Sequence, residues 1–277
     1  MSSYDLGKFG VWRGYQGFTP EDARELEKLG FGALWLGGSP PAELPVVESL
    51  LEATDSLVVG TSIVNIWTAA AKRTAESFHR IDQRFPGRFL LGVGAGHREA
   101  NGTEAIKPYD ALVQYLDELD DAGVPKERRA LAALGPRVLE LARDRTAGAL
   151  PYLTPPEHTR NARATLGAGS LLVAEQKVVL EEDAERAREI ARGMVPMYLG
   201  LVNYVNNLRR LGFTEEDLAE PGSDKLIDTL AVHGSPAEVA DGVLAHLDAG
   251  ADHVAIQALN KDYLPALRAL REKLGPR

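Results

Sequence analysis

The chain has 277 residues, of which 44% are hydrophobic and 26% are charged, a composition typical of a globular protein with a sizeable core. Its formal net charge is -9, with acidic and basic residues interspersed, which argues against binding to nucleic acids or anionic membranes. The chain has no cysteine, so disulfides, thiolate metal sites and thiol nucleophiles are excluded. Neither an apolar signal segment nor a membrane-spanning apolar run is present, which predicts a cytoplasmic protein.

Apolar segments of strand length alternate with amphipathic segments of helical length along most of the chain. The predicted strands span residues 8–12, 33–36, 57–67, 89–93, 129–134, 148–152, 171–180 and 253–259. The predicted helices that follow them span residues 19–30, 45–53, 71–84, 107–122, 135–145 and 155–166, and another precedes the last strand at residues 235–250. Further helical segments, with no strand among them, are predicted at residues 182–192, 196–211 and 223–231.

The alternation of strands and helices defines the predicted fold. Strands separated by helices pair in parallel through right-handed crossovers, and eight such strands indicate a closed (β/α)8 barrel of the α/β class rather than an open sheet. Capping boxes at Thr19 and Ser235 support the helices that begin there. We therefore expect a single barrel domain over residues 1–277, with the helices of residues 182–231 as an insertion before the last strand.

The segment RFLLGVGAGHRE, at residues 88–99, is the strongest candidate for a site. Sites of barrels lie at the C-terminal ends of the strands. Here an apolar strand ends in Gly-Ala-Gly, where the backbone can approach a ligand, and the ionisable residues His97 and Glu99 follow. A glycine pair of this spacing is a weak signal alone, because glycines also end strands that have no function.

Four segments match one family in order and spacing: GTSIVNIW at residues 60–67, GRFLLGVGAGHRE at 87–99, and the longer segments at 133–159 and 234–257. With them the sequence resembles the luciferase-like monooxygenase superfamily, and within it the branch of oxidoreductases that use coenzyme F420, a deazaflavin. The resemblance implies hydride transfer between F420 and a small organic substrate, in a homodimer. Two alternatives stay open: an FMN-dependent monooxygenase of the same superfamily, and a paralogue that binds a flavin or deazaflavin without turnover.

The resemblance implies a bulge at the end of the third strand, with a non-prolyl cis peptide bond between Ser62 and Ile63. Ile63 would lie behind the middle ring of the deazaflavin and hold it bent. Val64 and Asn65 would line the ring edge, and Asn65 is also a candidate catalytic residue because its amide can bond a polar group of the cofactor. Alternatively, Ile63 is part of the barrel core, which β-branched residues commonly fill.

The resemblance places the loop after the fourth strand beside the cofactor tail and the reactive face of the ring, with Gly94, Ala95, Gly96 and His97 as contacts. His97 is a candidate for proton transfer because imidazole titrates near neutral pH, and Glu99 is an alternative acid. The competing interpretations are that His97 only anchors the cofactor and that Glu99 is a solvated carboxylate.

A strand ends and a helix begins at residues 135–137, so free N–H groups and the positive end of a helix dipole suit a phosphate there. The resemblance places the cofactor phosphate near this turn and near the next strand end. The implied contacts are Gly135, Pro136, Arg137, Tyr152, Leu153 and Thr154. The alternative is an ordinary turn with a solvent-facing arginine.

The substrate side is less well defined. Trp12 and Trp67 could form an aromatic pocket with Gln176, although each tryptophan could equally be a packing residue at a strand end. Many relatives carry an acidic residue followed by histidine at the end of the second strand, but this chain has Gly37 and Gly38. The identity of the proton relay therefore stays open.

Other catalytic classes have little support. The six histidines lack the spacing of a metal site, so we expect no metal. No G-x-S-x-G elbow and no spaced dinucleotide-binding fingerprint occurs. Redox chemistry must then come from a cofactor, with a small molecule as the substrate.

Overall fold

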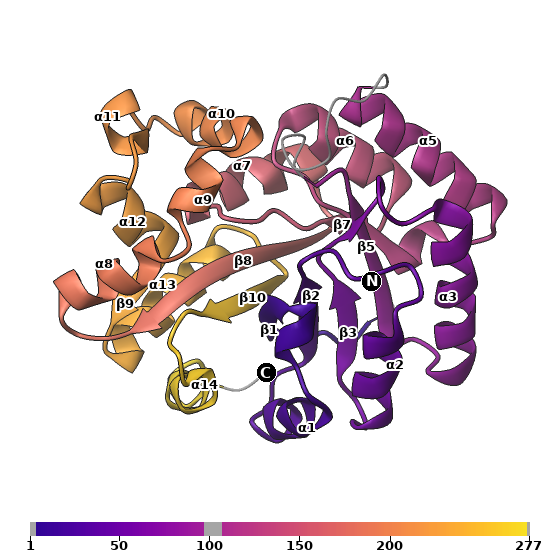
Figure 1. Cartoon of the computed structure of the whole chain (residues 1–277), viewed down its shortest axis with the longest axis horizontal. Helices are drawn as coiled ribbons and strands as arrows, with labels where there is room; N and C mark the ends of the chain where they lie inside the picture. The colour runs from indigo at the N-terminus through magenta and orange to yellow at the C-terminus, as the bar shows by residue number, and fades with distance from the viewer. Residues whose placement is uncertain (1–3, 97–106, 276–277) are drawn as a thin grey trace.

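The computed structural model describes residues 4–96 and 107–275 of the chain (Figure 1). The roles predicted for His97 and Glu99 therefore fall outside the described residues. Among the described residues, no helix combines the length and the apolar character needed to cross a bilayer.

Eight parallel strands form a closed barrel, which confirms the predicted fold class. The strands pair in the order β10-β1-β2-β3-β5-β6-β7-β8, and pairing between β8 and β10 closes the ring. Figure 1 shows helices around this barrel and β8 as a long strand across it. The barrel strands are β1 (Phe9–Gly14), β2 (Ala33–Gly37), β3 (Val58–Thr61), β5 (Phe89–Gly94), β6 (Arg129–Leu131), β7 (Gly148–Ala149), β8 (Leu171–Leu180) and β10 (His253–Ala258).

The helices around the barrel lie close to the predicted bounds. Thr19 and Ser235 form the capping boxes of α1 and α13 with Asp22 and Glu238. The helices are α1 (Pro20–Lys28), α2 (Pro45–Glu52), α3 (Ala71–Arg84), α5 (Pro108–Asp121), α6 (Pro136–Arg145), α7 (Pro156–Leu166), α13 (Pro236–Asp248) and α14 (Tyr263–Arg271), with short 3-10 turns η1 (Tyr15–Gly17) and η2 (Lys126–Arg128). Only α14 and the 3-10 turns have no predicted counterpart in this set.

The insertion before the last strand contains a strand that was not predicted. β7 pairs only with residues 171–172 of β8, so it leaves the rest of that side of β8 without a neighbouring barrel strand. There β9 (Ala231–Gly234) pairs in parallel with residues 177–180. The predicted helix at residues 196–211 is two helices, separated at residues 200–201. The helices of the insertion are α8 (Ala184–Arg192), α9 (Pro196–Leu199), α10 (Val202–Arg210), α11 (Glu215–Leu218) and α12 (Asp224–Leu230).

The predicted long third strand is divided by a bulge, and the predicted cis peptide bond between Ser62 and Ile63 is confirmed. Gly60 pairs with Leu90, and Val64 of β4 (Val64–Asn65) pairs with Val93. Between these two pairs the first strand advances by four residues and β5 by only three, so the first strand carries one extra residue. The hydroxyl of Thr61 fills the gap, donating to the carbonyl of Gly92 and accepting from its N–H, both at 2.8 Å. The bulge turns the Ser62-Ile63 unit toward the C-terminal end of the barrel.

The barrel interior is packed below the site. Trp35 donates its indole N–H to Nε2 of His253 (3.0 Å), and Nδ1 of this histidine donates to the carbonyl of Gly7 (2.9 Å). Apolar side chains fill the space around this pair: Ala33, Val58, Leu90, Ala130, Leu171, Val173 and Ala255. Because side chains alternate along a strand, the next inward positions of β8 are Glu175 and Lys177, which lie beneath the site.

Candidate active site at the C-terminal end of the barrel

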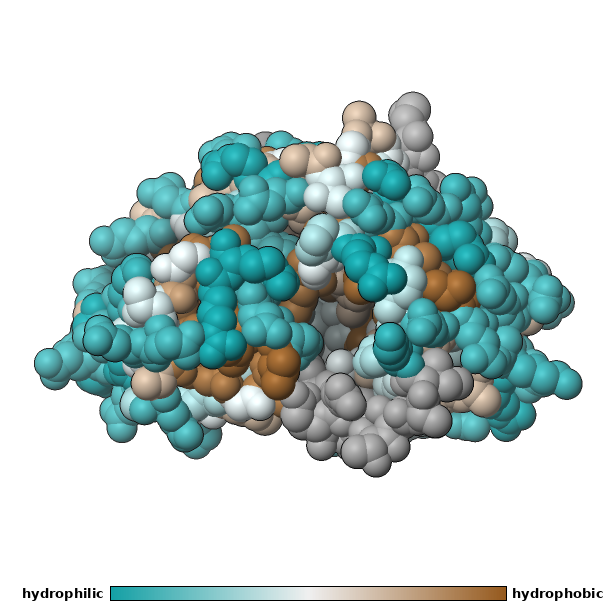
Figure 2. All heavy atoms as spheres, turned by 90° about the horizontal axis from the view of Figure 1, so that it is seen from above, coloured by the Kyte–Doolittle hydropathy of each residue, from teal (hydrophilic) through white to brown (hydrophobic). Residues whose placement is uncertain are grey.

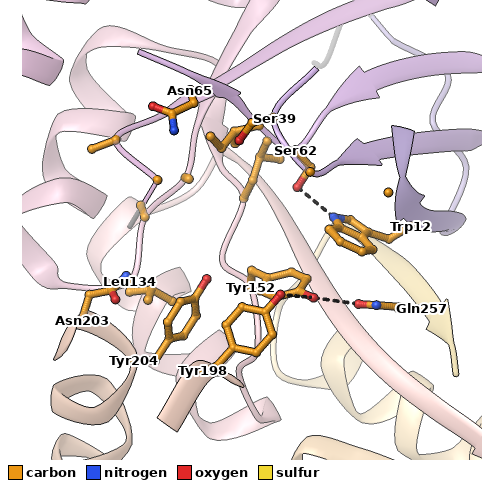
Figure 3. A pocket seen from close by; sticks show the side chains of 18 of the residues that line it. Trp12, Ser39, Ser62, Asn65, Leu134, Tyr152, Tyr198, Asn203, Tyr204 and Gln257 are labelled. Atoms are coloured by element: carbon orange, nitrogen blue, oxygen red, sulfur yellow. Dashed lines mark hydrogen bonds between the residues drawn. The ribbon is translucent and has the colours of Figure 1, made fainter. Parts of the chain in front are cut away.

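A cavity of about 1090 Å³ lies at the C-terminal ends of the barrel strands, where the fold predicts a site. Figure 2 shows a hollow near the middle of one face of the molecule, and Figure 3 shows the side chains that line the cavity. The strand ends form most of the wall, and α9 and α10 of the insertion close one side. The lining residues used below are Trp12, Ser62, Ile63, Asn65, Gly135, Tyr152, Tyr198, Asn203, Tyr204, Asn206, Arg210 and Gln257.

One wall of the cavity is the bulge after β3. The side chain of Ile63 fits against β5 because residue 94 is a glycine, and a Cβ there would lie 3.1 Å from Cγ1 of Ile63. Gly94 thus makes room for Ile63 and does not itself line the cavity. Asn65 lies beside Ile63, and its side-chain oxygen accepts the backbone N–H of Trp67 (3.0 Å), which fixes the orientation of the amide.

A second wall of the cavity is aromatic. Its rings come from β1, from the segment just beyond β7 and from the insertion. The ring centroid of Tyr152, just beyond β7, lies 4.9 Å from that of Trp12 and 5.4 Å from that of Tyr198. Tyr204 of α10 completes this aromatic wall, with its centroid 5.1 Å from Tyr198. Strand ends and insertion therefore build the wall together.

Hydrogen bonds order the hydroxyl groups of this wall (Figure 3). Tyr198 donates its O–H to the hydroxyl of Tyr152 (3.1 Å), which donates to Oε1 of Gln257 (2.9 Å). Burial and the negative charge of Glu175 raise the pKa of Tyr152 well above its usual value. The same two causes raise the pKa of Tyr198, against the hydrogen bond to Tyr152. These phenols are therefore protonated at neutral pH.

A buried ion pair lies beneath the aromatic wall. Nζ of Lys177 is 3.0 and 3.1 Å from the two carboxylate oxygens of Glu175, and the lysine is 0% exposed. The same Nζ lies 3.8 Å from the ring centroid of Tyr152, within the range of a cation-π contact. Burial lowers the pKa of Lys177, while the charge of Glu175 and its hydrogen bond to Lys177 oppose this shift. The pair thus places the amino group of Lys177 beneath the ring of Tyr152.

The end of the cavity between α6 and α10 is polar and basic. Gly135 is the N-cap of α6 and provides no capping side chain, and a guanidinium nitrogen of Arg210 lies 3.8 Å from where its Cβ would stand. Arg210 donates to Oδ1 of Asn207 (3.3 Å), whereas Nδ2 of this buried asparagine has no hydrogen-bond partner among the described residues. His158 donates to the carbonyl of Leu134 (2.9 Å), and burial, with Arg210 nearby, lowers its pKa.

The structure brings half of the predicted and described site residues to the cavity. Those in its lining are Trp12, Ser62, Ile63, Asn65, Ala95, Gly96, Gly135 and Tyr152. The others lie outside the lining: Val64, Trp67, Gly94, Pro136, Arg137, Leu153, Thr154 and Gln176. Three of these need a correction.

Gln176 does not contribute to the substrate pocket. It alternates with Glu175 and Lys177 on β8, so it points away from the barrel interior. Its side chain is 1% exposed, accepts a hydrogen bond from Nε2 of His246 (2.8 Å) and donates to the carbonyl of Leu230 (3.2 Å). Gln176 therefore joins β8 to the helices around the barrel.

Trp67 and Arg137 also lie away from the cavity. The indole N–H of Trp67 donates to the carbonyl of Ala95 (2.8 Å), so this tryptophan fixes the chain after β5 instead of walling the pocket. Arg137 is exposed, and its guanidinium lies 4.2 Å from the ring centroid of Tyr109. Arg210 of the insertion is the arginine that lines this end of the cavity.

Several residues of the site were not predicted, and two signals could have found them. Charged residues rarely lie in a buried strand unless they are paired, so Glu175 and Lys177 within an apolar run indicate an interior ion pair. A polar stripe at helical spacing runs along α10, at Asn203, Asn206 and Arg210. The aromatic residues Tyr198 and Tyr204 carried no such signal.

Comparison with known proteins extends this description. Residues 3–122 match the family model of the luciferase-like monooxygenases. A 5,10-methylenetetrahydromethanopterin reductase of Archaeoglobus fulgidus is 23% identical over an alignment that covers 78% of this chain and 84% of the reductase.

Solved structures share the fold at low identity. An F420-dependent secondary alcohol dehydrogenase, in complex with an F420-acetone adduct, superposes with a TM-score of 0.75 at 14% identity, over 96% of this chain and 97% of the other. An F420-dependent tetrahydromethanopterin reductase from Methanopyrus kandleri gives 0.71 at 15% identity, over 96% and 98%. An FMN-bound type II Baeyer-Villiger monooxygenase from Pseudomonas putida gives 0.67 at 13% identity, over 96% and 95%. The predicted resemblance is confirmed: the chain is similar to the luciferase-like monooxygenases in sequence over residues 3–122, and it shares the fold of F420-dependent enzymes over nearly its whole length.

Proposed function

We propose that this chain is an oxidoreductase that binds coenzyme F420 in the cavity and transfers a hydride between the coenzyme and a small organic substrate. The curated relative is a reductase, and two solved structures of the same fold are F420-dependent enzymes. These relatives support a luciferase-like oxidoreductase with a flavin or deazaflavin cofactor. The choice of F420 and of hydride transfer is our proposal.

The observation that carries the proposal is the bulge at Ser62 and Ile63, which lines the same cavity as the aromatic wall. Ile63 would support one face of a flat tricyclic ring and leave the other face toward Tyr152. At about 1090 Å³ the cavity is at or above the upper end of the range of about 300–1,000 Å³ for small-molecule sites, so ring and substrate fit together. When bound, the coenzyme would supply the hydride chemistry, and the protein would supply orientation and protons.

The charge of the cavity supports an anionic cofactor. Its described lining includes Arg13, Arg210 and Lys261 but no aspartate or glutamate, although the whole chain has a net charge of -9. At the N-terminal end of α6, the helix dipole and the guanidinium of Arg210 offer hydrogen-bond donors and positive charge. We propose that the phosphate of the coenzyme binds here, to Arg210 rather than to Arg137.

A second candidate is an FMN-dependent monooxygenase. The FMN-bound Baeyer-Villiger monooxygenase has the same fold, and FMN also combines a tricyclic ring with a phosphate. The two cofactors differ at ring position five, a carbon in the deazaflavin and a nitrogen in FMN. Only the nitrogen-containing ring would support oxygen chemistry.

Titration of the purified chain with oxidised F420 and, separately, with FMN tests the proposal. We expect saturable quenching of F420 fluorescence, with a dissociation constant at least roughly tenfold below that for FMN, equivalent to about 1.4 kcal/mol. Tight FMN binding without F420 binding would favour the monooxygenase. Binding of neither cofactor would contradict both candidates.

A further inference from the structure

We propose that Tyr152 exchanges the proton with the substrate, and that the substrate is a small neutral carbonyl compound or the corresponding alcohol. This inference rests on the proposed function, because the hydride comes from or goes to the reduced or oxidised deazaflavin. It adds the proton-transfer residue and the substrate class to that function.

The composition of the cavity wall limits the choice of residue. None of the lining residues that the structure describes is an aspartate, a glutamate or a histidine. The described lining groups best able to exchange a proton are therefore the phenols and Lys261, and Tyr152 is the phenol that is hydrogen-bonded to both Tyr198 and Gln257. Tyr152 and Ile63 line the same cavity, and in the proposed arrangement the substrate lies between Tyr152 and a ring supported by Ile63.

The backbone beside Tyr152 is held in an unusual conformation. Leu153 has a φ of 56°, a left-handed conformation that costs a branched side chain free energy. Its N–H donates to Oε2 of Glu175 at 3.0 Å, so the buried carboxylate fixes the chain next to Tyr152. Such strain is retained where the surroundings determine the position of a side chain, and here it directs Tyr152 into the cavity.

The surroundings of the phenol suit proton exchange. Tyr198 donates a hydrogen bond to the Tyr152 oxygen at 3.1 Å, and the ammonium group of Lys177 lies 3.8 Å from the ring centroid. Both interactions strengthen when negative charge develops on that oxygen. Lys177 and Tyr198 are thus positioning residues, while the hydroxyl of Tyr152 would contact the substrate.

The reaction balances as a two-electron reduction. In the reducing direction a C–H bond would form at the carbonyl carbon with the hydride that a bound reduced deazaflavin supplies, and the electron pair of the C=O π bond would move to the oxygen. That oxygen would take the proton of Tyr152, whose O–H would turn from Gln257 to the substrate. Tyr198 and Lys177 would stabilise the phenolate until water returns a proton. The oxidation of an alcohol is the reverse.

The substrate class follows from the chemistry of the wall. The rings of Trp12, Tyr198 and Tyr204 offer apolar surface, and the wall presents phenol donors without a lining carboxylate among the described residues. Arg210 lies at the end of the cavity assigned to the cofactor phosphate, and the other lining cations are Arg13 and Lys261. A neutral molecule with one hydrogen-bonding oxygen therefore fits this wall.

Steady-state assays of the full chain with reduced F420 and a panel of small ketones, beginning with acetone, test the inference. The Tyr152→Phe variant keeps the ring above Lys177 and removes only the hydroxyl. We expect its kcat to fall by at least roughly a hundredfold, the usual scale of general acid-base catalysis, with F420 quenching unchanged. The Tyr263→Phe variant, altered outside the cavity, is the matched control and should keep its rate.

The other results are equally decisive. A Tyr152→Phe rate within about twofold of that of the unaltered chain overturns the assignment. If the His97→Ala variant then loses its rate, His97 is the proton-transfer residue instead. If the unaltered chain binds F420 but reduces no ketone and oxidises no secondary alcohol, the substrate class and this inference are wrong, while the coenzyme proposal stands. If it binds no F420, the proposed function itself is wrong. Thermal unfolding of each variant shows that a lost rate is not lost folding.

Discussion

The indole of Trp12 occupies the space in which a side chain at residue 37 would lie: a Cβ added to Gly37 would come within 2.0 Å of Cζ2 of Trp12. The same indole donates its N–H to Oγ of Ser62 (3.2 Å) and packs against Tyr152. Trp12 therefore connects the bulge with the aromatic wall. The absence of an acidic residue at the end of β2 has a packing cause, because Trp12 and a longer residue 37 cannot both fit.

Replacement of Gly37 should show this exclusion. We expect Gly37→Ala to lower the free energy of unfolding by about 1–3 kcal/mol, because the added methyl overlaps Trp12. Urea unfolding measures the loss. Gly14→Ala is the matched control, since a Cβ there has no neighbour within 4 Å. A Gly37→Ala variant as stable as the control would contradict the packing argument, and the loss should shrink in a Trp12→Ala background.

Acidification should destabilise the barrel through His253. Burial lowers its pKa to about 4 in the folded chain, whereas an unfolded histidine has a pKa of about 6.5. The contribution of neutral His253 to the free energy of unfolding is complete above about pH 6.5. It is lost as pH falls toward 4, because the histidine of the unfolded chain then binds a proton that the buried histidine does not. We expect a loss on the order of 3 kcal/mol between these limits. His246, whose pKa is also lowered to about 4, adds to the slope.

Urea unfolding across pH 7 to 4.5 measures this dependence. The His253→Gln variant should be less stable at pH 7 but should show a shallower fall, since Trp35 loses its imidazole partner at every pH. His79→Gln, altered at an exposed position, should keep the full slope. A His253→Gln slope equal to that of the unaltered chain would show that this histidine is not the titrating group.

The ion pair of Glu175 and Lys177 should be costly to break. Glu175→Ala leaves a buried ammonium and the N–H of Leu153 without partners, so we expect a loss of about 3–5 kcal/mol. The double variant Glu175→Gln with Lys177→Met removes both charges. Its loss of stability should be clearly smaller than the sum of the losses of Glu175→Gln and Lys177→Met as single variants. Additive losses in denaturant unfolding would argue against the coupling.

Arg210 should contribute to cofactor affinity. We expect Arg210→Gln to weaken F420 binding by roughly tenfold or more, the scale of one hydrogen bond to a charged group, and to reduce its salt dependence. Arg137→Gln is the matched control because Arg137 is exposed and does not line the cavity. Fluorescence titration distinguishes the two. Equal effects of both changes would contradict the assignment of the phosphate to Arg210.

The barrel was predictable from the sequence because its strands and helices alternate with clear periodicity and turn signals. The strand β9 was not, since residues 231–234 pair with an edge of β8 that is open only because β7 is short. The bulge at Ser62 and Ile63 was predicted through the resemblance rather than through periodicity, which indicated one continuous strand.

The site was predicted where it depends on strand ends and missed where it depends on side-chain direction. Ile63, Gly135 and Tyr152 follow strands, so their positions at the cavity follow from the fold. Gln176 lies one position out of phase with the inward side chains, and sequence position alone did not fix that phase. Tyr198 was missed because it comes from the insertion, whose packing on the barrel has no local signal.

The most direct test of the central claim is a crystal structure of the chain with oxidised F420. We expect the deazaflavin ring in the cavity with one face on Ile63, its other face toward Tyr152, and its phosphate at Gly135 and Arg210. A ring bound outside this cavity, or one that leaves no space for a substrate between its free face and Tyr152, would contradict the proposed function.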